Sequence, residues 1–187
     1  MPGLYFEKGR LEKEMLYIKK ANDTDLQEEW LFVKEMPEDE NGMTNAWHGI
    51  SLEAFKDQAL PDMIRYEKGI GLPEGMVPET FLFLWLDDCI IGQFRIRHYL
   101  NEALRKGAGH IGYCIANKYR GKGYATEGLK LTLQIAKEIV KEEEIYLRVN
   151  KNNPASLRVM MKNGGIIVDE NEEKFFVRIR KGSISWE

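Results

Sequence analysis

The spacing of apolar residues divides the sequence into strands and helices. Short β-branched and aromatic runs, bounded by glycine, asparagine or aspartate, predict strands at 15–21, 80–86, 89–98, 110–116, 145–149, 166–168 and 174–180. Apolar residues that recur every three or four positions predict helices at about 24–36, 52–66, 125–140 and 154–163. Thr24 and Gln27 form a candidate capping box, and Pro61 is expected to kink or split the second helix.

The order of these elements predicts a mixed α/β fold. Three consecutive strands with short connections favour an antiparallel meander, and the long helix after them implies a crossover to a parallel neighbour. We therefore expect a central, mostly antiparallel sheet of about seven strands with helices on both faces. The polar loops at 37–50 and 69–78 are candidates for substrate contacts, although most loop residues only connect elements.

Composition narrows the class of protein. The chain has 187 residues, a net charge of −3 and 43% hydrophobic residues, which predicts one domain over 1–187, with a core at 15–180 and a charged lead-in at 1–14. No basic cluster indicates nucleic acid, and no apolar run is long enough for a membrane span or a secretory signal. Cys89 and Cys114 lack metal or redox spacing, so we expect free thiols, a cytoplasmic location and no metal.

The most informative segment lies where the strand 110–116 gives way to the long helix. It places two glycines and two cations, within Tyr119–Thr126, just before a helix N-terminus. Free backbone N–H groups and the helix dipole make this a candidate phosphate site, while a plain glycine-rich turn is the alternative. Two common phosphate motifs fail here: the dinucleotide fingerprint needs glycine where Thr126 stands, and the Walker loop needs serine or threonine where Gly123 stands.

Arg120-Gly121-Lys122-Gly123-Tyr124-Ala125 resembles the Arg/Gln-x-x-Gly-x-Gly/Ala signature of the GCN5-related N-acetyltransferases (GNAT). A second segment, with Asn153 and Ser156 before a helix that ends near Gly164, resembles the family's Asn-x-x-Ala segment. The resemblance implies a three-layer αβα fold whose sheet is splayed where acetyl-CoA binds, with the pyrophosphate on the loop and the helix start. It implies coenzyme contacts from Cys114, Ile115, Ala116, Arg120, Gly121, Lys122, Gly123, Tyr124, Ala125, Thr126, Asn153 and Ser156.

The chemistry implied by the resemblance is direct acetyl transfer from acetyl-CoA to a primary amine of a small molecule or peptide, in a ternary complex. A backbone N–H near Cys114–Ala116 should polarise the thioester carbonyl. Candidate general bases are His110, Glu102 and His98, because the ends of two neighbouring strands and their connector should lie close together.

One residue departs from the family pattern. Met160 stands where many members carry the tyrosine that protonates the leaving thiolate, so Tyr124, Tyr113 or solvent are the alternatives. A coenzyme-binding sensor without catalysis, or a transferase of a longer acyl group, therefore stays open. The identity of the acceptor and assembly as a homodimer also stay open.

Overall fold

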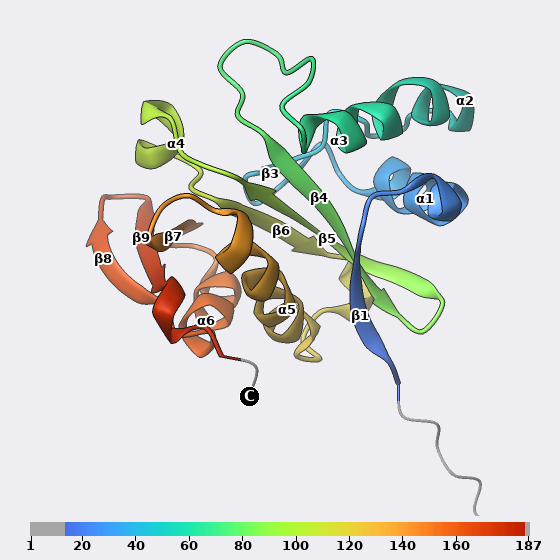
Figure 1. The fold of residues 1–187 in the computed structure, drawn as a ribbon. Helices are drawn as coiled ribbons and strands as arrows, with labels where there is room; N and C mark the ends of the chain where they lie inside the picture. The colour runs from blue at the N-terminus through green and yellow to red at the C-terminus, as the bar shows by residue number, and fades with distance from the viewer. Residues whose placement is uncertain (1–13, 186–187) are drawn as a thin grey trace, which may run out of the picture.

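The computed structural model describes residues 14–185, so nearly all of the lead-in lies outside the described chain. Seven strands form two sheets (Figure 1). The first sheet has the order β1-β4-β5-β6, with β1 at Leu16–Lys20, β4 at Glu79–Leu86, β5 at Cys89–Arg97 and β6 at Ile111–Ile115. The second has the order β7-β9-β8, with β7 at Glu144–Asn150, β8 at Ile166–Glu170 and β9 at Lys174–Arg180. Every pair of neighbours within these sheets is antiparallel, as expected for the meander β4-β5-β6, whereas the expected parallel neighbour of β6, β7, belongs to the other sheet.

The two sheets meet at one point. The N–H of His110 donates to the carbonyl of Tyr146 at 2.7 Å, and the N–H of Tyr146 donates to Nδ1 of His110 at 2.8 Å. Beyond this junction β6 and β7 belong to different sheets, and their later residues line opposite walls of one cleft. The predicted splay of the sheet therefore exists, and it starts at His110.

Alternation along β4 distributes apolar side chains to two cores. Leu82 and Leu84 pack against α5 (Tyr124–Ile139), whose buried stripe includes Leu129 and Leu133. Phe81, Phe83 and Trp85 face the other way and pack against α1 (Leu26–Glu35) and α3 (Leu60–Tyr66). Helices thus cover both faces of the first sheet, and α6 (Pro154–Lys162) lies beside α5 in Figure 1.

Of two local expectations about the early helices, the first was wrong and the second was confirmed. Asn22, not Thr24, caps the first helical segment: its side chain accepts from the N–H groups of Thr24 and Asp25, and a 3-10 turn at Asp23–Asp25 precedes α1. Pro61 interrupts the second helix, as expected, because Ala59 before it is already helical and the proline ring and missing N–H disturb the preceding turn. The irregularity lies before it, as a π-helical turn at Phe55–Ala59 that follows α2 (Leu52–Ala54).

Two regions expected to be connectors contain structure. The loop 37–50 folds into a ribbon of β2 (Asp39–Glu40) and β3 (Met43–Thr44), joined at Asn41-Gly42, both with positive φ. The connector before β6 contains α4 (Glu102–Lys106), capped by the Asn101 side chain, which accepts from the N–H of Leu104 at 2.9 Å. No helix in the described chain has the length and apolarity to cross a membrane.

Glu29 makes the stability of this fold sensitive to pH. Its side chain is fully buried on α1, and one carboxylate oxygen lacks a hydrogen-bond partner within the described residues. Burial raises the pKa of Glu29 to about 8, although the N–H of Asn22 opposes the shift. The folded state therefore holds a proton that the unfolded state releases above its pKa of about 4.3.

We expect Glu29→Gln to be more stable than the wild type above about pH 7, with the difference disappearing near pH 4. The stabilisation that protonated Glu29 gives the wild type is complete below the unfolded pKa and is lost as pH rises through about 8. Between these two pKa values the wild-type free energy of unfolding should fall by up to about 1.4 kcal/mol per pH unit relative to that of the variant. Urea unfolding between pH 5 and 9 measures it. Exposed Glu28→Gln is the control, and an unchanged slope in Glu29→Gln would contradict the account.

Candidate active site

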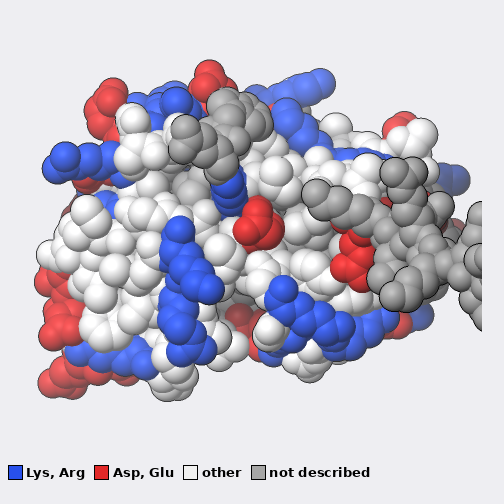
Figure 2. All heavy atoms as spheres, turned by 90° about the horizontal axis from the view of Figure 1, so that it is seen from below, with Lys and Arg blue, Asp and Glu red and all other residues white. Residues whose placement is uncertain are grey.

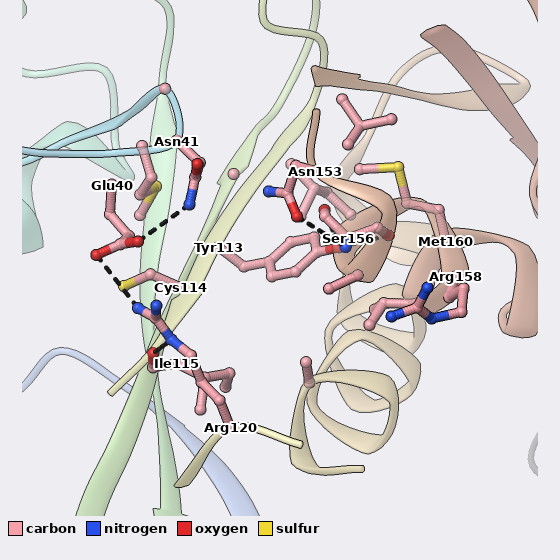
Figure 3. A pocket seen from close by; sticks show the side chains of 18 of the residues that line it. Glu40, Asn41, Tyr113, Cys114, Ile115, Arg120, Asn153, Ser156, Arg158 and Met160 are labelled. Atoms are coloured by element: carbon pink, nitrogen blue, oxygen red, sulfur yellow. Dashed lines mark hydrogen bonds and ion pairs between the residues drawn. The ribbon is translucent and has the colours of Figure 1, made fainter. Parts of the chain in front are cut away.

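A cleft of ≈ 450 Å³ opens where β6 and β7 diverge (Figure 3). Its walls come from β5, β6 and β7, from the starts of α5 and α6, and from the β2–β3 ribbon, which lies across one end. Of the residues expected to contact a coenzyme, the cleft is lined by Cys114, Ile115, Arg120, Gly121, Gly123, Tyr124, Ala125, Thr126, Asn153 and Ser156. Ala116 and Lys122 do not line it.

The start of α5 points its free N–H groups into the cleft region. Gly121 and Gly123 have φ of 75° and 89°, and Gly123 is the N-cap of the helix. The first hydrogen bond back to this cap runs from the N–H of Thr126 to the carbonyl of Gly123 at 2.9 Å, so the N–H groups of Tyr124 and Ala125 precede it. The molecule is viewed from this side in Figure 2, with Lys and Arg side chains spread among uncharged ones. This is an anion-binding geometry.

Arg120 ties the loop to two other parts of the cleft. Its Nε donates to the carbonyl of Ile115 at 2.8 Å, and its Nη2 lies 3.2 Å from the Glu40 carboxylate on the ribbon (Figure 3). Both side chains are partly exposed, so this ion pair adds little stability by itself. Its geometric effect is to hold the ribbon against the loop that precedes α5.

The edge of β6 that faces the cleft carries the backbone groups of alternate residues. In the β5–β6 ladder the N–H of Ala116 donates to the carbonyl of Ile91 at 2.9 Å, and the N–H of Arg97 donates to His110. By the two-residue alternation of the ladder, Cys114 also faces β5, whereas Tyr113 and Ile115 turn their N–H groups toward the cleft. A donor to a thioester carbonyl is therefore available at Tyr113 or Ile115, on either side of Cys114.

Tyr113 bridges the two walls. Its hydroxyl lies 2.7 Å from Oγ of Ser156, whose N–H donates to the Asn153 side chain at the start of α6 (Figure 3). Burial raises the pKa of Tyr113 to about 12, although the hydrogen bond with Ser156 opposes the shift. Tyr113 is therefore protonated at physiological pH, and the raised pKa makes it a weaker acid than a free tyrosine.

Cys114 is unsuited to act as a nucleophile. Burial raises the pKa of its thiol to about 11, and its Sγ lies 3.0 Å from Sδ of Met36. The reactive thiolate is therefore scarce at neutral pH. A covalent intermediate on Cys114 is therefore disfavoured.

The three base candidates lie outside the cleft lining. The strand ends carrying His98 and His110 are neighbours, as expected, since Arg97 N–H donates to the carbonyl of His110. Glu102 is highly exposed on α4 and pairs with Lys106 at 2.6 Å. His98 Nε2 lies 2.8 Å from the Thr80 hydroxyl, and burial lowers the pKa of His98. The structure therefore does not bring the three side chains together beside the cleft, and their role as bases stays a prediction.

His110 is held in one neutral tautomer. Nδ1 accepts from the N–H of Tyr146, so the ring proton is on Nε2, which donates to the Glu142 carboxylate at 3.0 Å. Burial lowers the pKa of His110, although the hydrogen bond to Glu142 opposes the shift. The lone pair that a base requires is already engaged in the junction between the sheets.

Several cleft residues were missed from the sequence. The ribbon residues Glu40–Thr44 belong to the loop 37–50, which was expected to contact the substrate, so the clearest omissions are four arginines, Arg95, Arg97, Arg148 and Arg158. The Asn41-Gly42 pair is a hairpin signal that could have identified the ribbon. Nothing local marks the arginines, because the polar faces of a strand (Arg95, Arg97, Arg148) and of a helix (Arg158) normally face solvent.

A cleft between two diverging sheets, with a glycine-rich helix start at its mouth, suits a phosphate-bearing ligand. Residues 13–166 match the model of the Acetyltransferase (GNAT) domain, and the chain belongs to this family of acetyltransferases. The expected family, fold class and type of enzyme are thereby confirmed. Among curated proteins, none has a sequence that matches this chain significantly.

Solved structures share the fold at low identity. The ribosomal-protein-S5-alanine acetyltransferase from Vibrio fischeri has a TM-score of 0.63 and 16% identity, with 94% of this chain and 98% of that one covered. Spermidine N-acetyltransferase from Vibrio cholerae, in complex with CoA and spermine, has a TM-score of 0.57 and 16% identity, with 90% of this chain and 97% of that one covered. Campylobacter jejuni PseH, an N-acetyltransferase in complex with acetyl-CoA, has a TM-score of 0.53 and 14% identity, with 89% of this chain and 99% of that one covered.

Proposed function

We propose that this acetyltransferase moves an acetyl group from acetyl-CoA directly to a primary amine of a small molecule or a peptide. The observation that carries the proposal is the start of α5, where N–H groups after Gly123 face the mouth of the cleft between the sheets. These groups suit the pyrophosphate of the coenzyme. The acyl arm would then follow the free edge of β6 toward Tyr113, opposite Ser156 on α6.

In the proposed reaction, the amine nitrogen attacks the thioester carbonyl, so a C–N bond forms as the C–S bond breaks. The N–H of Tyr113 or Ile115 stabilises the negative charge that develops on the carbonyl oxygen. The amine proton leaves through water, because any of His98, Glu102 and His110 would need a water chain to reach the cleft. The Tyr113 hydroxyl protonates the departing thiolate, a role for which Met160 has no proton.

Titration calorimetry with acetyl-CoA, with adenosine as the control ligand, tests the donor. Saturable one-to-one binding of acetyl-CoA alone, followed by thiol release with a panel of amines, is the expected result. No binding would reduce the segment Tyr119–Thr126 to a turn. Tight binding of acetyl-CoA with no thiol release in the presence of any amine would favour the coenzyme sensor. Thiol release only from longer acyl-CoA donors would favour the transferase of a longer acyl group.

We expect Tyr113→Phe to lower turnover about 10- to 100-fold and to leave the Kd for acetyl-CoA nearly unchanged. The substitution removes the hydroxyl that Ser156 orients, while the stacking of the ring on Phe94 remains. Steady-state kinetics and calorimetry measure the two effects. Tyr17→Phe, which removes a hydroxyl bonded to the Asp87 carbonyl on the far side of the sheet, is the control. Wild-type turnover in Tyr113→Phe would assign the proton to solvent.

A further inference from the structure

Positively charged groups line two parts of the cleft. One end holds the start of α5, Arg120 and Arg158, and the proposed coenzyme phosphates occupy it. The other end, under the β2–β3 ribbon, is lined by Arg95, Arg97 and Arg148. These three arginines have no part in the proposed coenzyme site, so their positive charge requires another explanation.

The three guanidinium groups converge from two sheets. Arg95 and Arg97 alternate with buried Phe94 and Ile96 on β5, which places both on the face toward the ribbon. Arg95 Nη2 donates to the carbonyl of Thr44 at 2.7 Å. Arg148 reaches across from β7: its Nη2 would lie 3.0 Å from a Cβ added at Gly42.

No ion pair neutralises this cluster. Within residues 14–185, no carboxylate lies within 4.0 Å of a side-chain nitrogen of Arg95, Arg97 or Arg148. Glu40, the acid that lines the cleft in this range, is paired with Arg120, and Glu79 faces Arg97 across the ladder without an ion pair. Arg95 Nε is buried without a partner in the same range.

The mutual influence of these groups agrees with that geometry. Burial lowers the pKa of the Arg97 guanidinium; Glu79 opposes the shift, and the nearby charges of Arg95 and Arg148 add to it. Half-buried like charges repel one another, and each favours a ligand that brings negative charge. Guanidinium forks match the paired oxygens of a carboxylate or a phosphate.

On the basis of the proposed function, we infer that the acceptor is a primary amine that also carries an anionic oxyacid group, held by Arg148 and Arg97 under the ribbon. The anionic group fixes the acceptor at the end of the cleft opposite the coenzyme phosphates, and the amine then faces the cleft-side edge of β6. A polyamine lacks this group and meets three positive charges, so it is a poor acceptor.

The test measures binding to the protein saturated with CoA by thermal shift and calorimetry. The probes share a short chain: 4-aminobutyrate, 3-aminopropyl phosphate, butylamine and spermidine. We expect the first two to bind at least about tenfold more tightly than the others, and their order identifies carboxylate or phosphate as the group recognised. Equal or tighter binding of butylamine or spermidine would overturn the inference.

Variants localise the effect. Arg148 forms none of the ion pairs above, so Arg148→Gln should fold normally and reduce the preference for the anionic probes by about tenfold, while Arg148→Lys restores part of it. Arg158→Gln, at the other end of the same cleft, should weaken CoA binding and keep the preference. An unchanged preference in Arg148→Gln would overturn the inference.

Acetyl transfer to the same amines, measured as release of the CoA thiol, distinguishes the anionic acceptor from the proposed function. Transfer that favours butylamine or spermidine leaves the proposed function intact and refutes the anionic acceptor. If probe binding depends on Arg148 but no amine causes release of thiol from acetyl-CoA, the anion site is supported and the proposed acetyl transfer is refuted.

Discussion

Gly123→Glu abolishes acetyl-CoA binding, with an expected rise in Kd of at least about a hundredfold. Gly123 caps α5 with φ of 89°, and no atom lies within 4 Å of a Cβ added there, so the protein itself accommodates the side chain. The new carboxylate would occupy the anion-binding end of the helix and repel the coenzyme phosphates. The left-handed backbone costs about 1–2 kcal/mol for a residue other than glycine, which is too little to unfold the chain.

Gly75→Glu is the matched control. Gly75 has φ of 79°, is exposed in the loop before β4 and also has no atom within 4 Å of an added Cβ. Both variants therefore add the same charge and a similar backbone strain, but Gly75 does not line the cleft. Calorimetry with acetyl-CoA and thermal unfolding distinguish them. Wild-type affinity in Gly123→Glu would remove the start of α5 from the coenzyme site, whereas lost affinity in both variants would point to misfolding.

Local signals explain why the coenzyme end of the cleft could be predicted. Glycine at positions 121 and 123, a strand before them and a stripe of apolar residues after them each follow from short-range preferences. The strand and the helix appeared with bounds close to those expected, as β6 and α5. Such features need no knowledge of what the rest of the chain packs against.

Features that depend on tertiary neighbours could not be predicted. Arg95 and Arg97 alternate with apolar residues, which is the pattern of a solvent-facing strand, and only the ribbon at 39–44 makes their surroundings a cleft. Pro61 marked the irregularity of the second helix, but its form as a π-helical turn at Phe55–Ala59 could not be predicted from the sequence. His110 was a candidate base from the sequence because nothing near it in the chain shows that both ring nitrogens are engaged. Its two hydrogen-bond partners, Tyr146 and Glu142, come from distant parts of the sequence.

His110→Ala is expected to lower the free energy of unfolding by about 3–5 kcal/mol. The ring is fully buried and links β6 to β7 and to Glu142. Alanine leaves a cavity, an unpaired Tyr146 N–H and a carboxylate without its donor. Because this junction sets where the sheets diverge, we also expect weaker acetyl-CoA binding. Urea unfolding measures the first effect and calorimetry the second, with exposed His48→Ala as the control.

The pH dependence of stability distinguishes a structural His110 from a catalytic one. Burial lowers the folded pKa of His110 below its unfolded value of about 6.5, so the unfolded state binds more protons between these two values. The contribution of His110 to wild-type stability should therefore fall as pH drops below about 6.5, opposite in sign to the contribution of Glu29. Burial also raises the pKa of Glu142, but hydrogen bonds from His110 and the Leu100 N–H outweigh this and lower it, so Glu142 adds to the loss at more acidic pH.

In His110→Ala the part of this loss due to the imidazole should disappear, and the fall in stability should begin at a lower pH. A base in the reaction would behave differently: the variant would keep wild-type stability and coenzyme affinity but lose turnover and its dependence on pH. The neutral tautomer, with Nδ1 committed to the Tyr146 N–H, leads us to expect the first pattern. Observation of the second pattern would return His110 to the chemistry and require the junction to open when the acceptor binds.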